Sequence, residues 1–209
     1  EGLALPFSSR ELLTMPSALY IAGDERLLSS TVRRVAIIGT RKPTELGRAR
    51  VRRLVRELVR ENICIVSGLA EGIDTEAHQA AIREGGKTMA VVGLPLDRVY
   101  PKKNSSLQEY IGREHLLVSQ FEPGVETHPS FFVQRNRTMA LLSDATVIIE
   151  AGDSSGTLSQ AAETVRNGKP LFILKSALDR PDLQWPARFV KRGAIVLTDS
   201  NQIMEVLNP

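Results

Sequence analysis

The chain has few of the residues that form disulfides, metal clusters or membrane spans. Its 209 residues include one cysteine, Cys64, inside an apolar run, and three histidines, His78, His115 and His128. A single cysteine cannot close an internal disulfide, and the histidines match no metal-ligand spacing, so we expect a buried thiol, no metal and no other cofactor. No apolar run approaches the roughly 20 residues of a membrane helix. The N-terminus lacks a signal-peptide pattern, so we expect a cytoplasmic protein with no membrane partner.

Aromatic residues are also scarce, at 5%, and the net charge is only +3. The charge is concentrated, however: residues 33–60 contain ten basic and two acidic side chains. A phosphate-bearing partner is one interpretation of this excess. The other is a solvated helix face, because four of the arginines recur every four residues: Arg48, Arg52, Arg56 and Arg60. We favour the solvated face for that stripe and the phosphate partner for Arg41, which follows a predicted strand.

Apolar runs typical of buried strands alternate with helical periodicity through most of the chain. Val35–Asp74 shows the unit: a buried strand, a basic loop, an amphipathic helix, a second strand and a glycine-bearing turn. This alternation predicts an α/β fold, a doubly wound, mostly parallel sheet with helices on both faces. The length and the 42% hydrophobic content predict one domain, residues 35–209, with residues 1–34 as an N-terminal extension packed on its core.

Loops that follow the predicted strands contain glycine, basic and hydroxyl side chains. Carboxyl ends of parallel strands meet at one edge of a sheet and form the binding crevice there. We therefore expect the loops to share one crevice and Arg41 and Arg135 to open onto it. The first loop leads into a helix whose N-terminus favours an anion. The candidate DNA- or phosphate-binding residues are Gly39, Thr40, Arg41, Ser67, Gly68, Lys102, Lys103, Arg135, Asn136, Arg137, Ser155, Gly156 and Thr157.

Each of these loops also has a purely structural explanation. The glycines could serve tight turns, and the arginines around Asn136 could form salt bridges with Glu122 or Glu126. Asp74 could cap the helix that it begins, or it could pair with His78, one turn later. Such a pair could be structural or chemical. No nucleophile-and-base set is evident, so we predict no catalytic residue.

Taken together, the loops resemble the DNA-processing protein A (DprA/Smf) family of bacteria. The order and spacing of the motifs follow that family from about Pro16 to Gly168. The matching segments are Gly39-Thr40-Arg41 with Thr44 and Gly47, Ser67–Asp74 with Ala77-His78, Tyr100-Pro101-Lys102 with Asn104, Arg135-Asn136-Arg137, and Glu150-Ala151 with Ser155-Gly156-Thr157.

The resemblance implies an extended Rossmann-like domain that binds single-stranded DNA, protects incoming strands in natural transformation and helps load the recombinase RecA, without established catalytic activity. It places Arg41 and Lys102 at DNA-contacting positive charges. Residues that it assigns to the same basic pocket are Ser67, Gly68, Arg135, Asn136 and Arg137. RecA and a second copy of the chain are implied partners through the second half. There Lys175–Trp185, which we expect to be an irregular loop, differs from the family pattern.

Two other functions fit the same fold class. One is a nucleotide-binding or nucleotide-processing enzyme of the phosphoribohydrolase type. Such enzymes carry a glycine-rich loop and a catalytic glutamate, whereas this chain has Asp153–Thr157 and Gln160 in that region. The other is a divergent nucleotide sensor in mobile-element defence.

Overall fold

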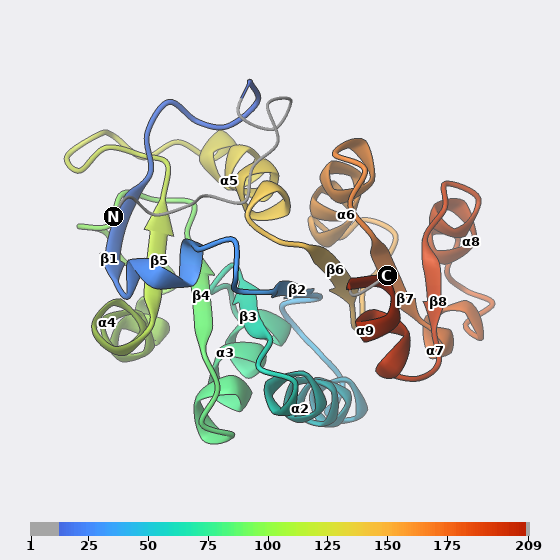
Figure 1. Ribbon diagram of the computed structural model, residues 1–209. Coiled ribbons are helices and arrows are strands. Elements are labelled where there is room, and N and C mark those ends of the chain that lie inside the picture. The colour runs from blue at the N-terminus through green and yellow to red at the C-terminus, as the bar shows by residue number, and fades with distance from the viewer. Residues whose placement is uncertain (1–12, 208–209) are drawn as a thin grey trace.

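The computed structural model describes residues 13–207, which form one mostly parallel sheet with helices on both faces (Figure 1). The strands are β1 (Tyr20–Gly23), β2 (Arg34–Ile38), β3 (Cys64–Ser67), β4 (Thr88–Val91), β5 (Leu116–Ser119), β6 (Ala145–Ile148), β7 (Leu171–Leu174) and β8 (Ile195–Leu197). The longer helices are α2 (Glu45–Arg60), α3 (Ile73–Arg83), α4 (Ser105–Glu114), α5 (Ser130–Leu141) and α6 (Thr157–Arg166). Shorter ones are η1 (Glu25–Leu28), η2 (Lys102–Asn104), α7 (Lys175–Leu178), α8 (Trp185–Val190) and α9 (Asn201–Leu207).

The strand order is β1-β5-β4-β3-β2-β6-β7-β8, and every neighbouring pair is parallel except β1 with β5. From β2 the chain winds outward through β3, β4 and β5, then returns to the other side of β2 as β6 and continues to β7 and β8. The order therefore reverses between β2 and β6. This confirms the predicted doubly wound, Rossmann-like fold, and it makes the β2–β6 junction the expected place for a binding crevice.

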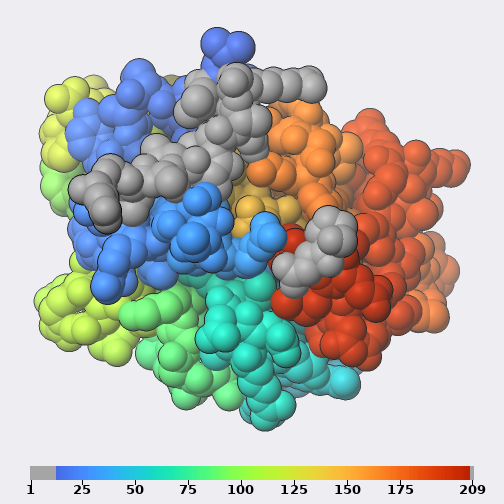
Figure 2. Space-filling model, in the orientation of Figure 1, coloured from blue at the N-terminus to red at the C-terminus, as the bar shows by residue number. Residues whose placement is uncertain are grey.

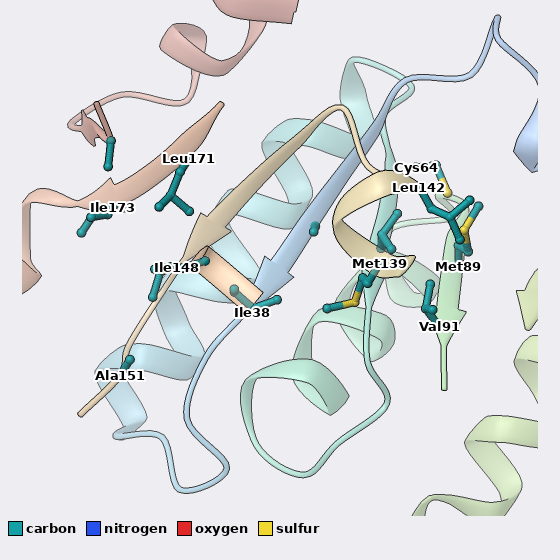
Figure 3. Packing of buried hydrophobic residues seen from close by; sticks show 14 of the residues in the cluster. Ile38, Cys64, Met89, Val91, Met139, Leu142, Ile148, Ala151, Leu171 and Ile173 are labelled. Atoms are coloured by element: carbon teal, nitrogen blue, oxygen red, sulfur yellow. The ribbon is translucent and has the colours of Figure 1, made fainter. Parts of the chain in front are cut away.

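Two apolar layers hold the helices against the sheet. On one face, α2 presents Val51, Leu54, Val55 and Leu58 at helical spacing, and α3 and α9 complete the layer. On the other face, Met139 and Leu142 lie beside Cys64, Met89 and Val91 (Figure 3). Cys64 is buried, and burial raises the pKa of its thiol to about 12, so the expected structural thiol is confirmed.

The part of the N-terminal extension that the structure describes is tied to the sheet. β1 pairs with the edge strand β5, and η1 packs its leucines on the core. Arg34, itself buried, donates hydrogen bonds to the carbonyl oxygens of Leu27, Ser29 and Leu142. Residues 1–12 of the predicted extension lie outside the described part of the chain.

Two sequence expectations about the surface can now be judged. The arginine stripe on α2 is paired with carboxylates: Arg48 and Arg52 contact Glu76, and Arg56 contacts Glu84, both on α3. The solvated-face interpretation is therefore confirmed for these three residues.

Figure 2 shows α2 (teal) and the C-terminal α9 (red) as neighbours on this side of the molecule. None of the helices within residues 13–207 is long and apolar enough to cross a membrane.

The prediction of an irregular loop over Lys175–Trp185 was wrong. Its first four residues form helix α7, and Trp185 begins α8 and is fully buried. The indole Nε1 donates to the carbonyl oxygen of Ala151 (2.9 Å), and the backbone N of Trp185 donates to Asp153 Oδ1 (2.8 Å). These contacts hold the segment against the loop that follows β6, which the local sequence alone did not reveal.

Candidate functional site

A pocket of about 510 Å³ lies where the strand order reverses, at the carboxyl ends of β2 and β6. Its walls come from the loop after β2, the loop after β6, and helices α5 and α6. Eight of the predicted residues line it: Gly39, Thr40, Arg41, Arg135, Asn136, Ser155, Gly156 and Thr157. Residues that were not predicted also contribute, among them Lys42, Phe132 and Gln160. The expectation that Arg41 and Arg135 reach one crevice is confirmed.

A smaller pocket adjoins the first and shares Arg41, Phe132 and Arg135 with it. It contains Gly68, so the loop after β3 reaches the same edge of the sheet. Its far side is lined by Arg98 and Tyr100, neither of which was predicted as a site residue. Both residues lie in the loop after β4, just before the predicted site residues Lys102 and Lys103, and this position could have identified them as site residues from the sequence.

Arg41 lies on a loop that is fixed at both sides. Thr40 N donates to the carbonyl oxygen of Glu150 (2.7 Å), and Ile73 N donates to the carbonyl oxygen of Thr40 (3.2 Å). The Arg41 side chain is exposed, and no carboxylate within residues 13–207 pairs with it. It therefore contrasts with the paired arginines of α2, because its charge is available to a ligand.

The predicted anion seat at the N-terminus of α2 is occupied by the protein itself. Thr44 caps the helix by accepting from Gly47 N (3.0 Å), and Glu150 Oε2 accepts from Thr44 N (3.0 Å) and Oγ1 (3.1 Å). A Cβ at Gly47 would lie 2.1 Å from that oxygen, so a larger residue there would displace the Glu150 carboxylate. The expectation of a ligand anion at this helix end is corrected: a carboxylate of the chain already satisfies it.

Arg135 is buried, with 7% of its surface exposed, and its guanidinium is directed at backbone. Its Nη1 donates to the carbonyl oxygens of Gly68 (2.7 Å) and Val91 (2.6 Å), at the ends of two parallel strands. A Cβ at Gly68 would lie 2.3 Å from the same nitrogen, which explains the glycine. The alternative of salt bridges to Glu122 or Glu126 is not found among the described residues. Arg135 thus ties three elements together beneath the pocket.

Asp74, also buried, supports this arrangement. Its Oδ2 accepts from Gly68 N (3.2 Å). Burial raises the pKa of the carboxyl group, while the Arg135 charge and the backbone N–H groups act in the opposite direction. Burial likewise lowers the pKa of Arg135, and Asp74 opposes that shift. The two buried groups therefore influence each other electrostatically beneath the pocket, although each is hydrogen-bonded to backbone and the two form no direct ion pair.

His78 does not pair with Asp74, so of the alternatives left open by the sequence this one is not found. His78 Nδ1 lies 2.7 Å from Thr88 Oγ1, whose own proton is donated to the Ile65 carbonyl oxygen (2.7 Å). The threonine must therefore accept, and Nδ1 carries the imidazole proton. Burial lowers the pKa of His78 to about 3, so the ring is neutral at physiological pH.

The loop before α6 presents small side chains and free backbone toward the pocket. Ser155 Oγ accepts from Thr157 N (3.2 Å) and donates to Thr157 Oγ1 (2.8 Å). Gly156 has φ −57° and ψ −19°, which any residue adopts, and a Cβ there would meet nothing within 4 Å. The backbone conformation therefore does not require glycine at position 156, and the open space leaves room for a ligand to approach its backbone.

The remaining predicted residues lie apart from the main pocket. Ser67 is buried and donates through Oγ to the Ile37 carbonyl oxygen (2.7 Å). Lys102 and Lys103 are exposed on η2, and Lys103 forms an ion pair with Glu71 (2.7 Å). Arg137 is exposed on α5 and lines neither pocket. Among the described residues, no group of histidine, cysteine and carboxylate side chains is arranged to hold a metal ion.

The fold is that of a Rossmann-like α/β protein, with an exposed arginine at the switch point of its sheet. Residues 4–208 match the family described as DNA recombination-mediator protein A, and the chain belongs to that family. DNA processing protein DprA of Bacillus subtilis is 32% identical over 202 residues, covering 97% of this chain and 68% of that protein. Protein Smf of Escherichia coli is 32% identical, and 51% of its length is covered.

Solved structures of the same family have the same fold. DNA processing protein A of Streptococcus pneumoniae superposes with a TM-score of 0.84 at 34% identity, covering 96% of this chain and 70% of that chain. The Helicobacter pylori protein, described for its single-stranded DNA binding mode, gives 0.83 at 32% identity, covering 99% and 93%. A molybdenum cofactor binding protein of Rippkaea orientalis shares only the fold, with a TM-score of 0.59 at 17% identity.

Proposed function

We propose that the chain binds single-stranded DNA through the pocket at the β2–β6 switch point. The observation that carries the proposal is the contrast in arginine pairing: three arginines of the α2 stripe contact carboxylates, whereas no carboxylate within residues 13–207 pairs with Arg41, which lines the same pocket as Gly156. An exposed guanidinium and a backbone segment with open space around it, at a strand-end crevice, suit a phosphodiester. The single-stranded DNA binding of the H. pylori relative supports the same ligand.

Family membership also supports a proposal for the pathway. We propose that this cytoplasmic protein protects incoming strands in natural transformation and helps load the recombinase RecA, and that it forms a homodimer. The predicted site residues Lys102, Lys103 and Arg137, which are exposed outside the main pocket, would extend the contact along the DNA backbone. The domain arrangement proposed from the sequence, a core of residues 35–209 with the extension 1–34 packed on it, would act as one binding unit.

Single strands should bind more tightly than duplex. The two adjoining pockets follow the strand-end loops and suit one flexible backbone, and only a few aromatic side chains, such as Phe132 and Tyr100, lie beside them. Affinity should therefore rest on phosphates more than on stacked bases, with weak sequence preference. A competition assay between a short oligo-dT and a duplex of equal length tests this. Equal affinity for the two would contradict the crevice geometry.

The carboxylates in and near the pocket support binding without catalysis. Glu150 accepts from Thr44 N, Asp74 accepts from Gly68 N, and Asp153 accepts from Gln184 N and Trp185 N. Each is therefore engaged by backbone and is not poised as a general base. Incubation with nucleoside monophosphates, followed by assay for released base, tests the phosphoribohydrolase alternative. Base release that disappears on mutation of Asp74 would overturn the non-catalytic proposal.

Arg41→Ala should weaken DNA binding without disturbing the fold. The side chain makes no internal ion pair, so unfolding free energy should change by no more than about 0.5 kcal/mol. Affinity for oligo-dT should fall by roughly 1–3 kcal/mol. The log–log slope of affinity against salt should flatten by about 0.7 for one lost phosphate contact.

Arg56→Ala is the matched control, because Arg56 is an exposed arginine that is paired with Glu84 on the helical face. Its affinity and salt slope should stay near those of the parent chain. Equal slopes for all three proteins would mean that Arg41 contacts no phosphate.

Gly156→Ala should separate a ligand requirement from a folding requirement. The backbone angles and the empty surroundings tolerate a methyl group, so thermal stability should be nearly unchanged. Oligo-dT affinity should nevertheless fall several-fold, because the methyl group occupies the open space through which a phosphate would approach the Gly156 backbone. Gly112→Ala, in α4, where the nearest atom is 3.7 Å from the added Cβ, serves as the control. Unchanged binding by Gly156→Ala would remove α6 from the DNA path.

A further inference from the structure

Glu150 is bonded to both ends of the loop that carries Arg41. Its carbonyl oxygen accepts from Thr40 N (2.7 Å), immediately before Arg41. Its side-chain Oε2 accepts from Thr44 N (3.0 Å) and Thr44 Oγ1 (3.1 Å), three residues after it. Thr44 in turn caps α2 by accepting from Gly47 N (3.0 Å). One residue of the β6 loop therefore sets the path of residues 40–44 and the start of the following helix.

The direction of the Arg41 side chain depends on that path. No ion pair within residues 13–207 holds its guanidinium, so the backbone alone aims it toward the pocket. The opposite side of the loop has one anchor, the hydrogen bond from Ile73 N to the Thr40 carbonyl oxygen (3.2 Å). Loss of the Glu150 side chain would remove both hydrogen bonds from Thr44 to the β6 loop, so that the end of the Arg41 segment would be held through α2 alone.

We infer that Glu150 is a positioning residue, which acts on DNA binding through Arg41; the inference rests on the proposed function. The negative charge of Glu150 should weaken DNA binding, whereas its hydrogen bonds to the Arg41 loop should strengthen it. A carboxylate beside a phosphate site repels DNA, so removing the charge alone would tighten binding. Removing the anchor would weaken binding, because an unfixed Arg41 must be ordered when DNA binds. A rise in DNA affinity when Glu150 is replaced would therefore show that charge repulsion dominates, and a fall would show that the anchoring of the Arg41 loop dominates.

The test compares Glu150→Ala with Glu150→Gln. The glutamine keeps an oxygen that can accept from both Thr44 donors but lacks the charge. We expect Glu150→Gln to bind oligo-dT within about twofold of the parent or more tightly, and Glu150→Ala to bind about five- to tenfold more weakly. The salt slope of Glu150→Ala should flatten as that of Arg41→Ala does, which a general loss of stability would not produce.

The Arg41→Ala background shows whether Glu150 acts through Arg41. There, Glu150→Ala should change affinity by less than about twofold, because the group that it positions is gone. Should Glu150→Ala fail to fold, Thr44→Val and Thr44→Ser replace it: the valine lacks the hydroxyl and should weaken binding, and the serine should restore it.

Three results would count against the inference. Binding by Glu150→Ala that is as tight as, or tighter than, the parent would show that only charge matters. An equal loss in the parent and Arg41→Ala backgrounds would show that Glu150 acts elsewhere. If the parent itself failed to bind oligo-dT, the proposed function would fall together with the inference, whereas either of the first two results overturns the inference alone.

Discussion

Arg135→Ala should destabilise the protein by roughly 2–5 kcal/mol, because leaving each buried acceptor without its donor costs about 1–3 kcal/mol. The alanine leaves the carbonyl oxygens of Gly68 and Val91 without the guanidinium that donates to them, and it removes the nearby positive charge that opposes the effect of burial on the pKa of Asp74. For a domain of this size, each kcal/mol lowers the melting temperature by roughly 2–4 °C. Thermal and denaturant unfolding of the variant beside the parent measure the change.

This prediction distinguishes two roles for Arg135. The sequence pattern predicts a guanidinium that binds DNA phosphate, whereas the structure shows one that is buried on backbone oxygens. Arg137→Ala, an exposed arginine on the same helix, is the control and should leave stability within about 0.5 kcal/mol of the parent. If Arg135→Ala were as stable as the parent but bound DNA poorly, Arg135 would be a direct contact and the structural role would be wrong.

The sheet could be predicted from the sequence because its signals are local. The central strands are short apolar runs such as Val35–Ile38 and Ile63–Val66, which are followed by Gly39 and Ser67, and α2 shows its buried face in the spacing of its valines and leucines. Parallel pairing and a switch point then follow from the alternation of strands and helices. The same pattern was enough to predict that the loops after the parallel strands lie at one edge of the sheet.

The details of the site could not be predicted, because they depend on contacts between distant residues. Glu150 caps a helix that begins about one hundred positions earlier in the chain, and Arg135 is buried by the loops after β3 and β4. Nothing near either residue in the sequence marks these roles. The segment Lys175–Trp185 shows the same limit, since Trp185 is anchored by Ala151 and Asp153. Motifs located the crevice, but tertiary contacts decide which charges remain free to bind.

His78 should make the folded state lose stability as the pH falls below about 6.5. Its pKa is about 3 in the folded protein and near 6.5 when unfolded, so only the unfolded chain takes up the proton between these values. When folding lowers the pKa of a group, the free energy of unfolding is highest at pH values above the pKa of the unfolded chain, and it decreases as the solution is acidified below that pKa. Between pH 7.5 and pH 4 the loss from His78 alone should be about 3 kcal/mol.

His78→Asn isolates this contribution, because the amide can donate to Thr88 Oγ1 as Nδ1 does but does not titrate. The variant should be less stable than the parent at pH 7.5, since the smaller side chain leaves a cavity. Its stability should nevertheless fall less steeply with acid, so the two curves should converge toward pH 4. Urea unfolding at intervals between these pH values measures both. Parallel curves would show that His78 is not kept neutral by burial and that the buried carboxylates, Asp74 among them, govern the acid response instead.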